Sequence, residues 1–409
     1  MSRAVTTALS ARRVRAIDAF RGLTILVMVF VNQLAGVSGV PQWARHMSAD
    51  ADAMSFVDVV FPAFLFIVGM SIPIALARRR AQGDDGAALQ RHVLARTLGL
   101  LVLGLFMVNA EDGFDAASMP MTMGAWQLAL YGCAFLVWGV HGRAARGGRD
   151  GWRTVGVLGL LVLADAYHGG HDGSAWMTHQ WWGILGLIGW SYLISATVFL
   201  QCGGRLGGLL VAAAACIAYY AAGHAVDARA HPGWAAILCE PAMVCETSLT
   251  LLGVVTATLF FGESTSMSMT ATSAPSSPRP RHAQLLALWG VLVAAGALLR
   301  PLYTISKIYG SPTWCLYSAA ICIALFAALH WWIDVRGHAR WTAFLTPVAA
   351  NPLVAYLIPF IVAAALEAFH VELPDAFDHG ATGVAFCVAF VAFVLGATAL
   401  VTRRVRLQL

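Results

Sequence analysis

An amide, an imidazole and a carboxylate follow one another where one apolar segment of the chain ends and the next begins. Asn32 lies near the end of the first apolar segment, His46 in the short loop after it, and Asp58 at the start of the second segment. A neutral imidazole can take a proton from an ammonium or a hydroxyl, or can itself be acylated, and a nearby carboxylate fixes its tautomer. We therefore take His46, Asp58 and Asn32 as candidate catalytic residues.

A structural interpretation of these residues also stays open. An asparagine in a membrane helix commonly makes an interhelical hydrogen bond, and an aspartate at a helix start commonly caps it. The presence of a histidine does not by itself distinguish a catalytic from a structural role, because other loops also carry one, for example at His168 and His179.

Further polar residues occur where apolar ones would serve, and together they indicate a polar cavity among the helices. Arg21 can pair with Asp18 one helical turn away, which gives either a charge-paired helix start or an anchor for an anionic cofactor. Asn351 precedes a proline and is predicted to break an apolar segment, which frees backbone groups inside the bundle. We take as candidate cofactor-binding residues Arg21, Gln127, Lys307 and Asn351.

Apolar segments of about twenty residues recur along the whole chain, as expected for helices that cross roughly 30 Å of hydrocarbon. The sequence is 59% hydrophobic and 11% charged. Lipid cannot satisfy backbone amides, so the predicted fold is an all-α, polytopic transmembrane bundle. We predict eleven to twelve spans, at about 19–40, 55–77, 95–110, 121–140, 154–168, 181–201, 206–223, 244–262, 284–304, 312–333, 342–366 and 380–401.

The basic residues predict the orientation of these spans. With a cytoplasmic N-terminus, 21 of the 26 Lys and Arg residues fall on the inner side, many of them in the basic segment 78–96. Both termini are therefore predicted to be cytoplasmic. The first apolar segment resembles a signal peptide but is too long for one, so we interpret it as a retained helix. The net charge of +5 follows from this topology and gives no indication of nucleic-acid binding.

The chain is predicted to divide at a segment rich in Ser, Thr and Pro that cannot build a core. The predicted parts are a cytoplasmic tail (1–18), a first membrane bundle of about eight helices (19–262), a flexible cytoplasmic linker (263–283) and a second bundle of about four helices (284–409).

The eight cysteines are scattered, and no spacing typical of a metal site occurs. Most of them are predicted to act as small apolar residues. Cys239 and Cys245 are predicted to share an outer loop, where a disulfide between them is an open alternative to two free thiols.

Several motifs resemble the heparan-alpha-glucosaminide N-acetyltransferase family of polytopic membrane acyltransferases. The strongest lie at residues 13–22 (RVRAIDAFRG), 28–32 (MVFVN) and 58–69 (DVVFPAFLFIVG), with His46 between them. Weaker matches follow in order at 124–127 (GAWQ), 311–314 (SPTW) and 351–356 (NPLVAY). The resemblance implies transfer of an acetyl group from cytosolic acetyl-CoA to an amine or hydroxyl across the membrane.

The resemblance also implies roles for individual residues. The essential histidine of the family falls on His46, its first-helix asparagine on Asn32 and its second-helix aspartate on Asp58. Two departures matter: the stretch from His46 to Asp58 is two residues longer, and Leu128 replaces a basic residue after Gln127. The large outer insertion of the animal enzymes is absent, which favours a bacterial envelope glycan or amino sugar over heparan sulfate as acceptor.

We therefore predict an acyl-CoA-dependent N- or O-acetyltransferase without a metal, in contact with membrane lipid. Direct transfer and a route through acylated His46 are both compatible with these residues. A homodimer is an alternative to a monomer. The main rival interpretation is a transporter or flippase whose polar residues line a substrate path, and a non-catalytic scaffold is a third.

Overall fold

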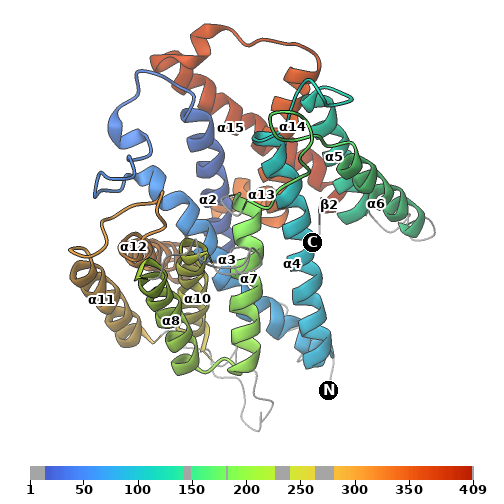
Figure 1. The fold of residues 1–409 in the computed structure, drawn as a ribbon. Coiled ribbons are helices and arrows are strands. Elements are labelled where there is room, and N and C mark those ends of the chain that lie inside the picture. Colours follow the sequence, from blue (N-terminus) through green and yellow to red (C-terminus); the bar gives the residue numbers. More distant parts are fainter. Residues whose placement is uncertain (1–13, 142–148, 181–182, 226–239, 263–280, 408–409) are drawn as a thin grey trace. The chain divides into compact units, whose positions relative to one another are not determined.

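Long apolar helices form most of the described chain, which confirms the predicted all-α class (Figure 1). This computed structural model describes residues 14–141, 149–180, 183–225, 240–262 and 281–407. Within those residues nine helices are long and apolar enough to span a membrane, or ten if the bent pair α13 and α14 is one span. The protein is an integral membrane protein.

The α-helices of the described residues are α2 (Arg15–Leu34), α3 (Phe56–Ala81), α4 (Gly86–Glu111), α5 (Met123–Trp138), α6 (Arg149–Asp165), α7 (Ile184–Gln201), α8 (Leu206–Ala225), α10 (Pro241–Phe261), α11 (His282–Leu299), α12 (Pro312–His330), α13 (Thr346–Ala350), α14 (Pro352–Ala368) and α15 (Gly380–Thr402). The shorter elements are η1 (Gln42–Ala44), η5 (Trp331–Val335), η6 (Arg340–Leu345), η7 (Asp375–Asp378), β1 (Gly139–His141) and β2 (Val405–Leu407).

Each of the twelve predicted spans overlaps one helix or, for the eleventh, the pair α13 and α14. The segment Arg340–Ala350, which includes α13, and α14 are bent by 71° relative to each other at Asn351, so the predicted break is confirmed. α5 and α6, with 16 and 17 residues, are shorter than the roughly twenty residues that cross the hydrocarbon core. The total of twelve and the cytoplasmic location of both termini remain predictions.

Two predicted boundaries at the basic segment 78–96 were wrong. Arg78, Arg79 and Arg80 form the last turn of α3, and α4 begins at Gly86, so only four residues connect the two helices. α4 accommodates charge because a long side chain can pack its apolar stem against a neighbour. The guanidinium of Arg96 lies 4.9 Å from the centre of the Tyr192 ring.

The chain folds into two compact units, and each unit combines segments that are far apart in the sequence. Unit 1 comprises residues 1–24, 42–97 and 188–343, and unit 2 comprises residues 25–41, 98–187 and 344–409. Neither unit coincides with the predicted bundles 19–262 and 284–409. The predicted linker lies almost entirely outside the described residues.

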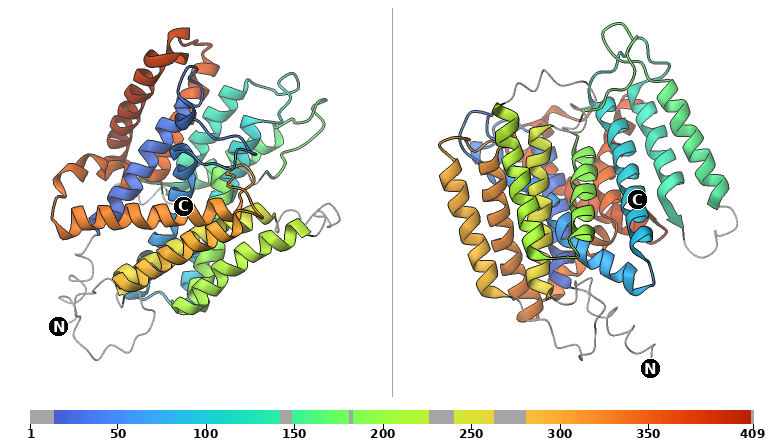
Figure 2. Two further views of the ribbon diagram at one scale, coloured as in Figure 1. Left: turned by 90° about the vertical axis from the view of Figure 1, so that its left-hand side faces the viewer. Right: turned by 60° about the horizontal axis from the view of Figure 1, so that its bottom comes forward.

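Unit 1 is built around α10, which is the most deeply buried of its helices. α3, α8 and α12 pack against α10, and α11 packs against α12, as the two views in Figure 2 show. The close approach of α3 and α10 depends on two glycines. A Cβ atom at Gly69 would collide with the backbone of Thr250, and one at Gly253 with the backbone of Phe66. Small residues at a helix crossing permit such packing in membranes.

Unit 2 packs α5 against α6 and α14, and α14 against α15. Its small sheet pairs β1 antiparallel to β2, with Val140 opposite Arg406. The side chain of Asn351, which is fully buried, holds the chain end in place. Its amide donates to the Thr402 hydroxyl (3.3 Å) and to the Val405 carbonyl (3.1 Å), and its carbonyl accepts from the Leu407 backbone (3.2 Å).

Candidate functional site

Asp58 lies in the first turn of α3, where a capping box fixes its position. Ser55 caps the helix: its hydroxyl accepts from the Val57 backbone at 3.1 Å, and its own N–H donates to the Asp58 carboxylate at 2.9 Å. A capping box satisfies two backbone donors that a helix start would otherwise leave free. The same local sequence that starts α3 therefore also orients Asp58.

The Asp58 carboxylate is almost completely buried and accepts four hydrogen bonds. One oxygen accepts from the Ser55 backbone, the Ser55 hydroxyl (3.2 Å) and the Met47 backbone (3.3 Å). The other oxygen lies 2.7 Å from Nδ1 of His46. A buried carboxylate is tolerated when donors of this kind stabilise its charge.

His46 completes a histidine–carboxylate pair whose imidazole remains accessible. Its side chain is 38% exposed, whereas that of Asp58 is 2% exposed. An ionised carboxylate only accepts, so the contact places a proton on Nδ1 of His46 and leaves Nε2 as the basic nitrogen of the neutral ring. Carboxylate–imidazole pairs of this form orient a general base.

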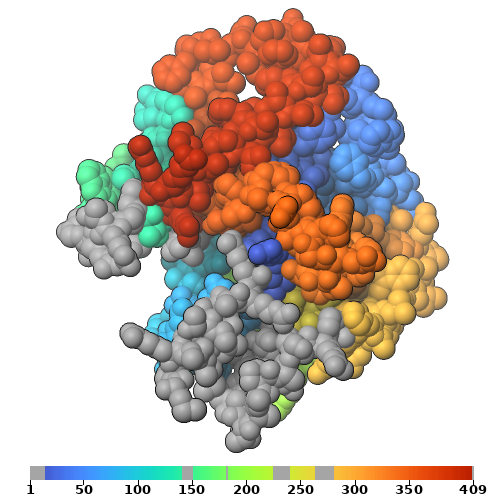
Figure 3. All heavy atoms as spheres, turned by 180° about the vertical axis from the view of Figure 1, so that it is seen from behind, coloured from blue at the N-terminus to red at the C-terminus, as the bar shows by residue number. Residues whose placement is uncertain are grey.

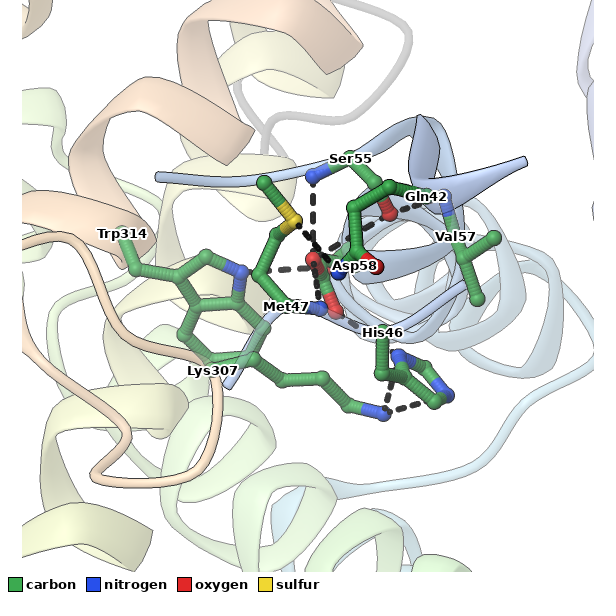
Figure 4. Close-up of polar contacts among 8 residues, drawn as sticks. All are labelled: Gln42, His46, Met47, Ser55, Val57, Asp58, Lys307 and Trp314. Carbon is green, nitrogen blue, oxygen red and sulfur yellow. Dashed lines mark hydrogen bonds and ion pairs between the residues drawn. The ribbon is translucent and has the colours of Figure 1, made fainter. Parts of the chain in front are cut away.

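Lys307 approaches the same ring from the loop between α11 and α12. Its Nζ lies 3.1 Å from Nε2 and 3.2 Å from Nδ1 of His46 (Figure 4). Burial lowers the pKa of Lys307, and the nearby carboxylates of Asp58 and Glu246 oppose this shift. The sequence predicted Lys307 as a cofactor contact, and the structure places it at the candidate catalytic histidine.

The loop that carries Lys307 is fastened to the loop that carries His46. Arg300 donates from Nε to both carboxylate oxygens of Asp52, at 3.2 and 3.1 Å, and the backbone of Ile305 donates to the same carboxylate at 2.9 Å. The bond from Ile305 is the main cause of a lowered pKa at Asp52. Tyr309 donates to Asp50 at 3.1 Å, which raises the pKa of Tyr309.

Trp314 joins the site to the core of unit 1. Its fully buried indole donates from Nε1 to the backbone carbonyl of Asp58 at 3.1 Å. It lies three residues after Ser311, whose hydroxyl accepts from the Trp314 backbone and caps α12. The capped starts of α3 and α12 therefore meet at Asp58.

Arg21 lies at a different level of unit 1. It pairs with Asp18 at 3.5 Å, as predicted, and donates to the Ser71 hydroxyl at 2.6 Å. Ser71 follows Asp58 by thirteen residues in α3, or about 20 Å at 1.5 Å per residue. The helix begins at Arg15, so Asp18 lies within its first turn instead of before it.

The three remaining predicted residues lie in unit 2. Asn32 is exposed on α2, and the Gln127 amide donates to the Ala110 carbonyl at 3.2 Å. Asn351 makes the three bonds to the C-terminal segment described above. The catalytic role of Asn32 and the cofactor contacts of Gln127 and Asn351 remain predictions.

Residues that support His46 were recognised only in part from the sequence. The pairing of Asp58 with His46 was predicted, but the contact with Lys307 was not, because 261 positions separate the two residues. Arg300, Asp52 and Trp314 were also missed as partners of this site. The polar loop sequence before α12 and its single lysine were the only available signals.

The predicted location of Cys245 in an outer loop was wrong. Cys245 lies inside α10, fully buried, and its Sγ is 3.8 Å from Sγ of Cys315. Cys239, its predicted alternative partner, lies outside the described residues. A helix start at Pro241 explains the difference, because proline is favoured in the first turn of a helix.

Comparison with known proteins gives partial matches. Residues 13–174 match the family described as a domain of unknown function, DUF5009. The chain is 35% identical over 101 residues to heparan-alpha-glucosaminide N-acetyltransferase of Mus musculus and 31% identical over 97 residues to that of Homo sapiens. Each match covers 24% of this chain and 14% of the relative. These matches confirm that the chain is similar, over about a quarter of its length, to the heparan-alpha-glucosaminide N-acetyltransferase family.

Proposed function

We propose that the protein is an acetyltransferase that uses cytosolic acetyl-CoA and an amino-sugar or glycan acceptor on the periplasmic side of a bacterial inner membrane. The observation that carries the proposal is the pair of buried Asp58 and accessible His46, joined at 2.7 Å. In such a pair Nδ1 of the imidazole carries the proton and Nε2 is basic, as general-base catalysis of acyl transfer requires. The partial similarity to the N-acetyltransferases supports the choice of acetyl as the group transferred.

His46 is the base in this proposal. Nδ1 of His46 donates its proton to the hydrogen bond with Asp58, so Nε2 carries no proton and can take one from the acceptor amine or hydroxyl as this group attacks the thioester carbonyl. Asp58 then stabilises the imidazolium that forms. The same nitrogen can instead attack the thioester, which would give the acyl-histidine route.

Two further groups complete the proposed chemistry. Asn32 would donate a hydrogen bond to the oxyanion that develops on the thioester carbonyl, a role for amide side chains in acyl transfer. Lys307 adds a positive charge near His46 when it is protonated, and this charge also favours a developing oxyanion.

The acyl donor would be held through its phosphates at the far end of unit 1. Arg78, Arg79 and Arg80 end α3 about twenty residues, or roughly 30 Å, from Asp58, which is about the thickness of the hydrocarbon core. Nε of Arg96 is buried without a hydrogen-bond partner among the described residues, so a donor suited to a phosphate is present there. We propose Arg21 and this basic end as the donor site; acetyl-CoA supplies the activated thioester.

Ligand-dependent stability tests the donor assignment. We expect acetyl-CoA to stabilise the detergent-solubilised protein, because a ligand that binds only the native state adds about 2.7 kcal/mol at one hundred times its Kd. Arg21→Ala should reduce this shift, and Arg205→Ala, at an exposed position in the same unit, serves as the matched control. Absence of any shift with CoA and acetyl-CoA over a wide concentration range would exclude the acyl-CoA assignment.

Reporter fusions test the proposed sidedness. We expect reporters after Arg80 and within 263–282 on the cytoplasmic side, and reporters near His46 and Asp172 on the periplasmic side. A reporter near His46 that proved cytoplasmic would contradict transfer to an acceptor across the membrane. Inward-facing and outward-facing states that exchange a bound solute, without acetyl transfer, would instead indicate a transporter.

A further inference from the structure

A primary amine of the protein lies within hydrogen-bond distance of the candidate base. Nζ of Lys307 lies 3.1 Å from Nε2 and 3.2 Å from Nδ1 of His46, and Nε2 is the nitrogen that the contact with Asp58 leaves basic. Hydrogen-bond reach of the base is the geometric requirement for general-base catalysis. Lys307 is also the only lysine in the sequence, so it is the only lysine side chain whose amine could be acetylated.

The loop conformation holds Lys307 at this position. Ser306 and Ser311 close the loop with reciprocal bonds: the Ser306 backbone donates to the Ser311 hydroxyl, and the Ser311 backbone donates to the Ser306 carbonyl, both at 3.0 Å. Between them, the Gly310 backbone donates to the Lys307 carbonyl at 3.1 Å. Gly310 has φ +57°, a conformation that glycine adopts without strain. The amine is therefore presented by a defined turn.

The surroundings of Lys307 also favour its reactive, neutral form. Burial lowers the pKa of Lys307 from that of an ordinary lysine. The titratable groups that face it are His46 and Asp58 on one side and Glu246 of α10 on the other, and both carboxylates oppose the shift. Glu246 lies against the same turn, since a Cβ atom at Gly310 would be 3.4 Å from its Oε1. A neutral amine is the nucleophilic form.

We propose that Lys307 is itself an acetyl acceptor, so that the protein acetylates its own active site when donor is present without an external acceptor. This inference rests on the proposed function, because it requires an acetyl thioester near His46. The Nζ lone pair forms a bond to the thioester carbonyl carbon, and the C–S bond breaks. His46 takes the proton from Nζ and returns it to the departing thiolate, so the products are an N-acetyl-lysine and a free thiol.

Modification would change the site in two ways. The amide cannot be protonated, so Lys307 can no longer place a positive charge near Asp58 and Glu246. The acetyl group also occupies the approach to Nε2 of His46, where the external acceptor must bind. We expect acceptor turnover to fall after preincubation with donor alone, and we expect acceptor present from the start to protect against this loss.

The experiment measures acetylation directly, by intact mass and peptide mapping of the full-length protein incubated with acetyl-CoA. Acetylation of Lys307 should survive hydroxylamine, which removes an acyl group from histidine. Its rate should rise with pH as the neutral fraction of the amine grows, and should level off at lower pH than acetylation of a lysine introduced by Gln82→Lys. Gln82 is exposed at the end of α3 and provides the background rate of chemical acetylation.

Variants and turnover separate this inference from the proposed function. His46→Ala should reduce acetylation of Lys307 to the background rate, and Lys307→Arg should abolish the stable label. Turnover of an amino-sugar acceptor with no acetyl group on Lys307 at any pH would overturn the inference and leave the proposed function intact. Equal labelling of Lys307 in wild type and His46→Ala would overturn it as well. Absence of both turnover and labelling would contradict the proposed function itself.

Discussion

Two histidine–aspartate pairs lie among the described residues of unit 1, and their surroundings differ. His46 and Asp58 are joined at 2.7 Å and lie beside the start of α12, from which Trp314 donates to Asp58. His330 and Asp334 lie at the end of α12 and are joined at 3.1 Å. Trp314, which reaches Asp58, precedes His330 by sixteen residues, or about 24 Å along the helix. The same two residue types therefore occur at opposite ends of one helix.

The second pair lies against aromatic side chains and a helix start. The His330 ring packs against Phe260 and Phe326, with ring centres 5.3 and 6.1 Å away, and its side chain is 16% exposed. Asp334 also accepts the backbone N–H of Ala16 at 3.2 Å and so caps α2. Figure 3 shows the start of α2 in dark blue against the orange segment that follows α12.

The difference indicates which pair can do chemistry. The His46 imidazole is exposed and has a basic nitrogen beside a lysine, and its carboxylate is held by donors other than the histidine. The His330 imidazole is packed among rings, and its carboxylate is engaged by a helix start. An accessible base with a buried partner is typical of catalysis, and a packed histidine that shares a capping carboxylate is typical of structure.

Asn32→Ala is expected to have the largest effect among the supporting residues. Removing one oxyanion donor lowers turnover by about 10²- to 10³-fold. Affinity for acetyl-CoA should stay close to wild type, because the donor acts on charge that develops only in the transition state. Steady-state kinetics with varied donor measures both quantities. A change confined to KM would contradict the oxyanion role of Asn32.

Exchange of Asp58 or Asp334 for asparagine tests whether the two pairs differ in function. Asp58→Asn should lower turnover by about 10²-fold, because the amide no longer enforces the Nδ1–H tautomer of His46. Asp334→Asn should leave turnover near wild type and lower the free energy of unfolding by about 1 kcal/mol, through a weaker cap and a weaker bond to His330. Parallel turnover and chemical-denaturation measurements test both. Equal loss of turnover in the two variants would remove the distinction between the pairs.

Arg300→Ala is expected to lower turnover several-fold, because it loosens the loop that carries Lys307 from the loop that carries His46. The loss of turnover in Arg300→Ala should be largest at neutral pH. The lowered pKa of Asp52 keeps its carboxylate ionised there, and the contact is lost only as the pH falls through that lowered pKa. A turnover–pH profile of wild type and variant, with the global unfolding midpoint as control, checks this. Identical profiles and rates would contradict a positioning role for the loop.

His330→Phe should have the smallest effect on activity. Phenylalanine fills the same aromatic cluster and removes only the bond to Asp334, which is worth about 1 kcal/mol. Turnover should be unchanged, and the unfolding midpoint should move slightly. Loss of turnover with retained stability would show that the second pair also takes part in the chemistry.

The sequence predicted the helices well where apolar residues repeat without charge, and less well where charge enters a helix. The break at Asn351 was predicted because proline disfavours a helical residue before it. The start of α4 was misplaced because Arg91 and Arg96 read as loop residues, although the long arginine side chain packs along a helix. Rules that consider only neighbouring residues in the sequence do not describe how the apolar part of an arginine side chain packs against another helix.

Only those residues of the site that are close together in the sequence could be predicted. His46 and Asp58 are twelve residues apart, and family motifs mark both. Lys307 and Arg300 reach the site from more than two hundred residues away, through packing of α12 against α3 that no local pattern encodes. The division into two units has the same origin, because each unit joins segments that are distant in the sequence.

Transfer of radiolabelled acetyl from acetyl-CoA to amino-sugar acceptors by wild type, His46→Ala and His330→Ala tests directly whether His46 is the catalytic base. His46→Ala should lose at least about 10²-fold in turnover, the typical contribution of a general base, while its fold and its stabilisation by acetyl-CoA persist. His330→Ala should retain turnover. Equal turnover in wild type and His46→Ala would contradict the assignment of His46 as the catalytic base, and with it the proposed active site.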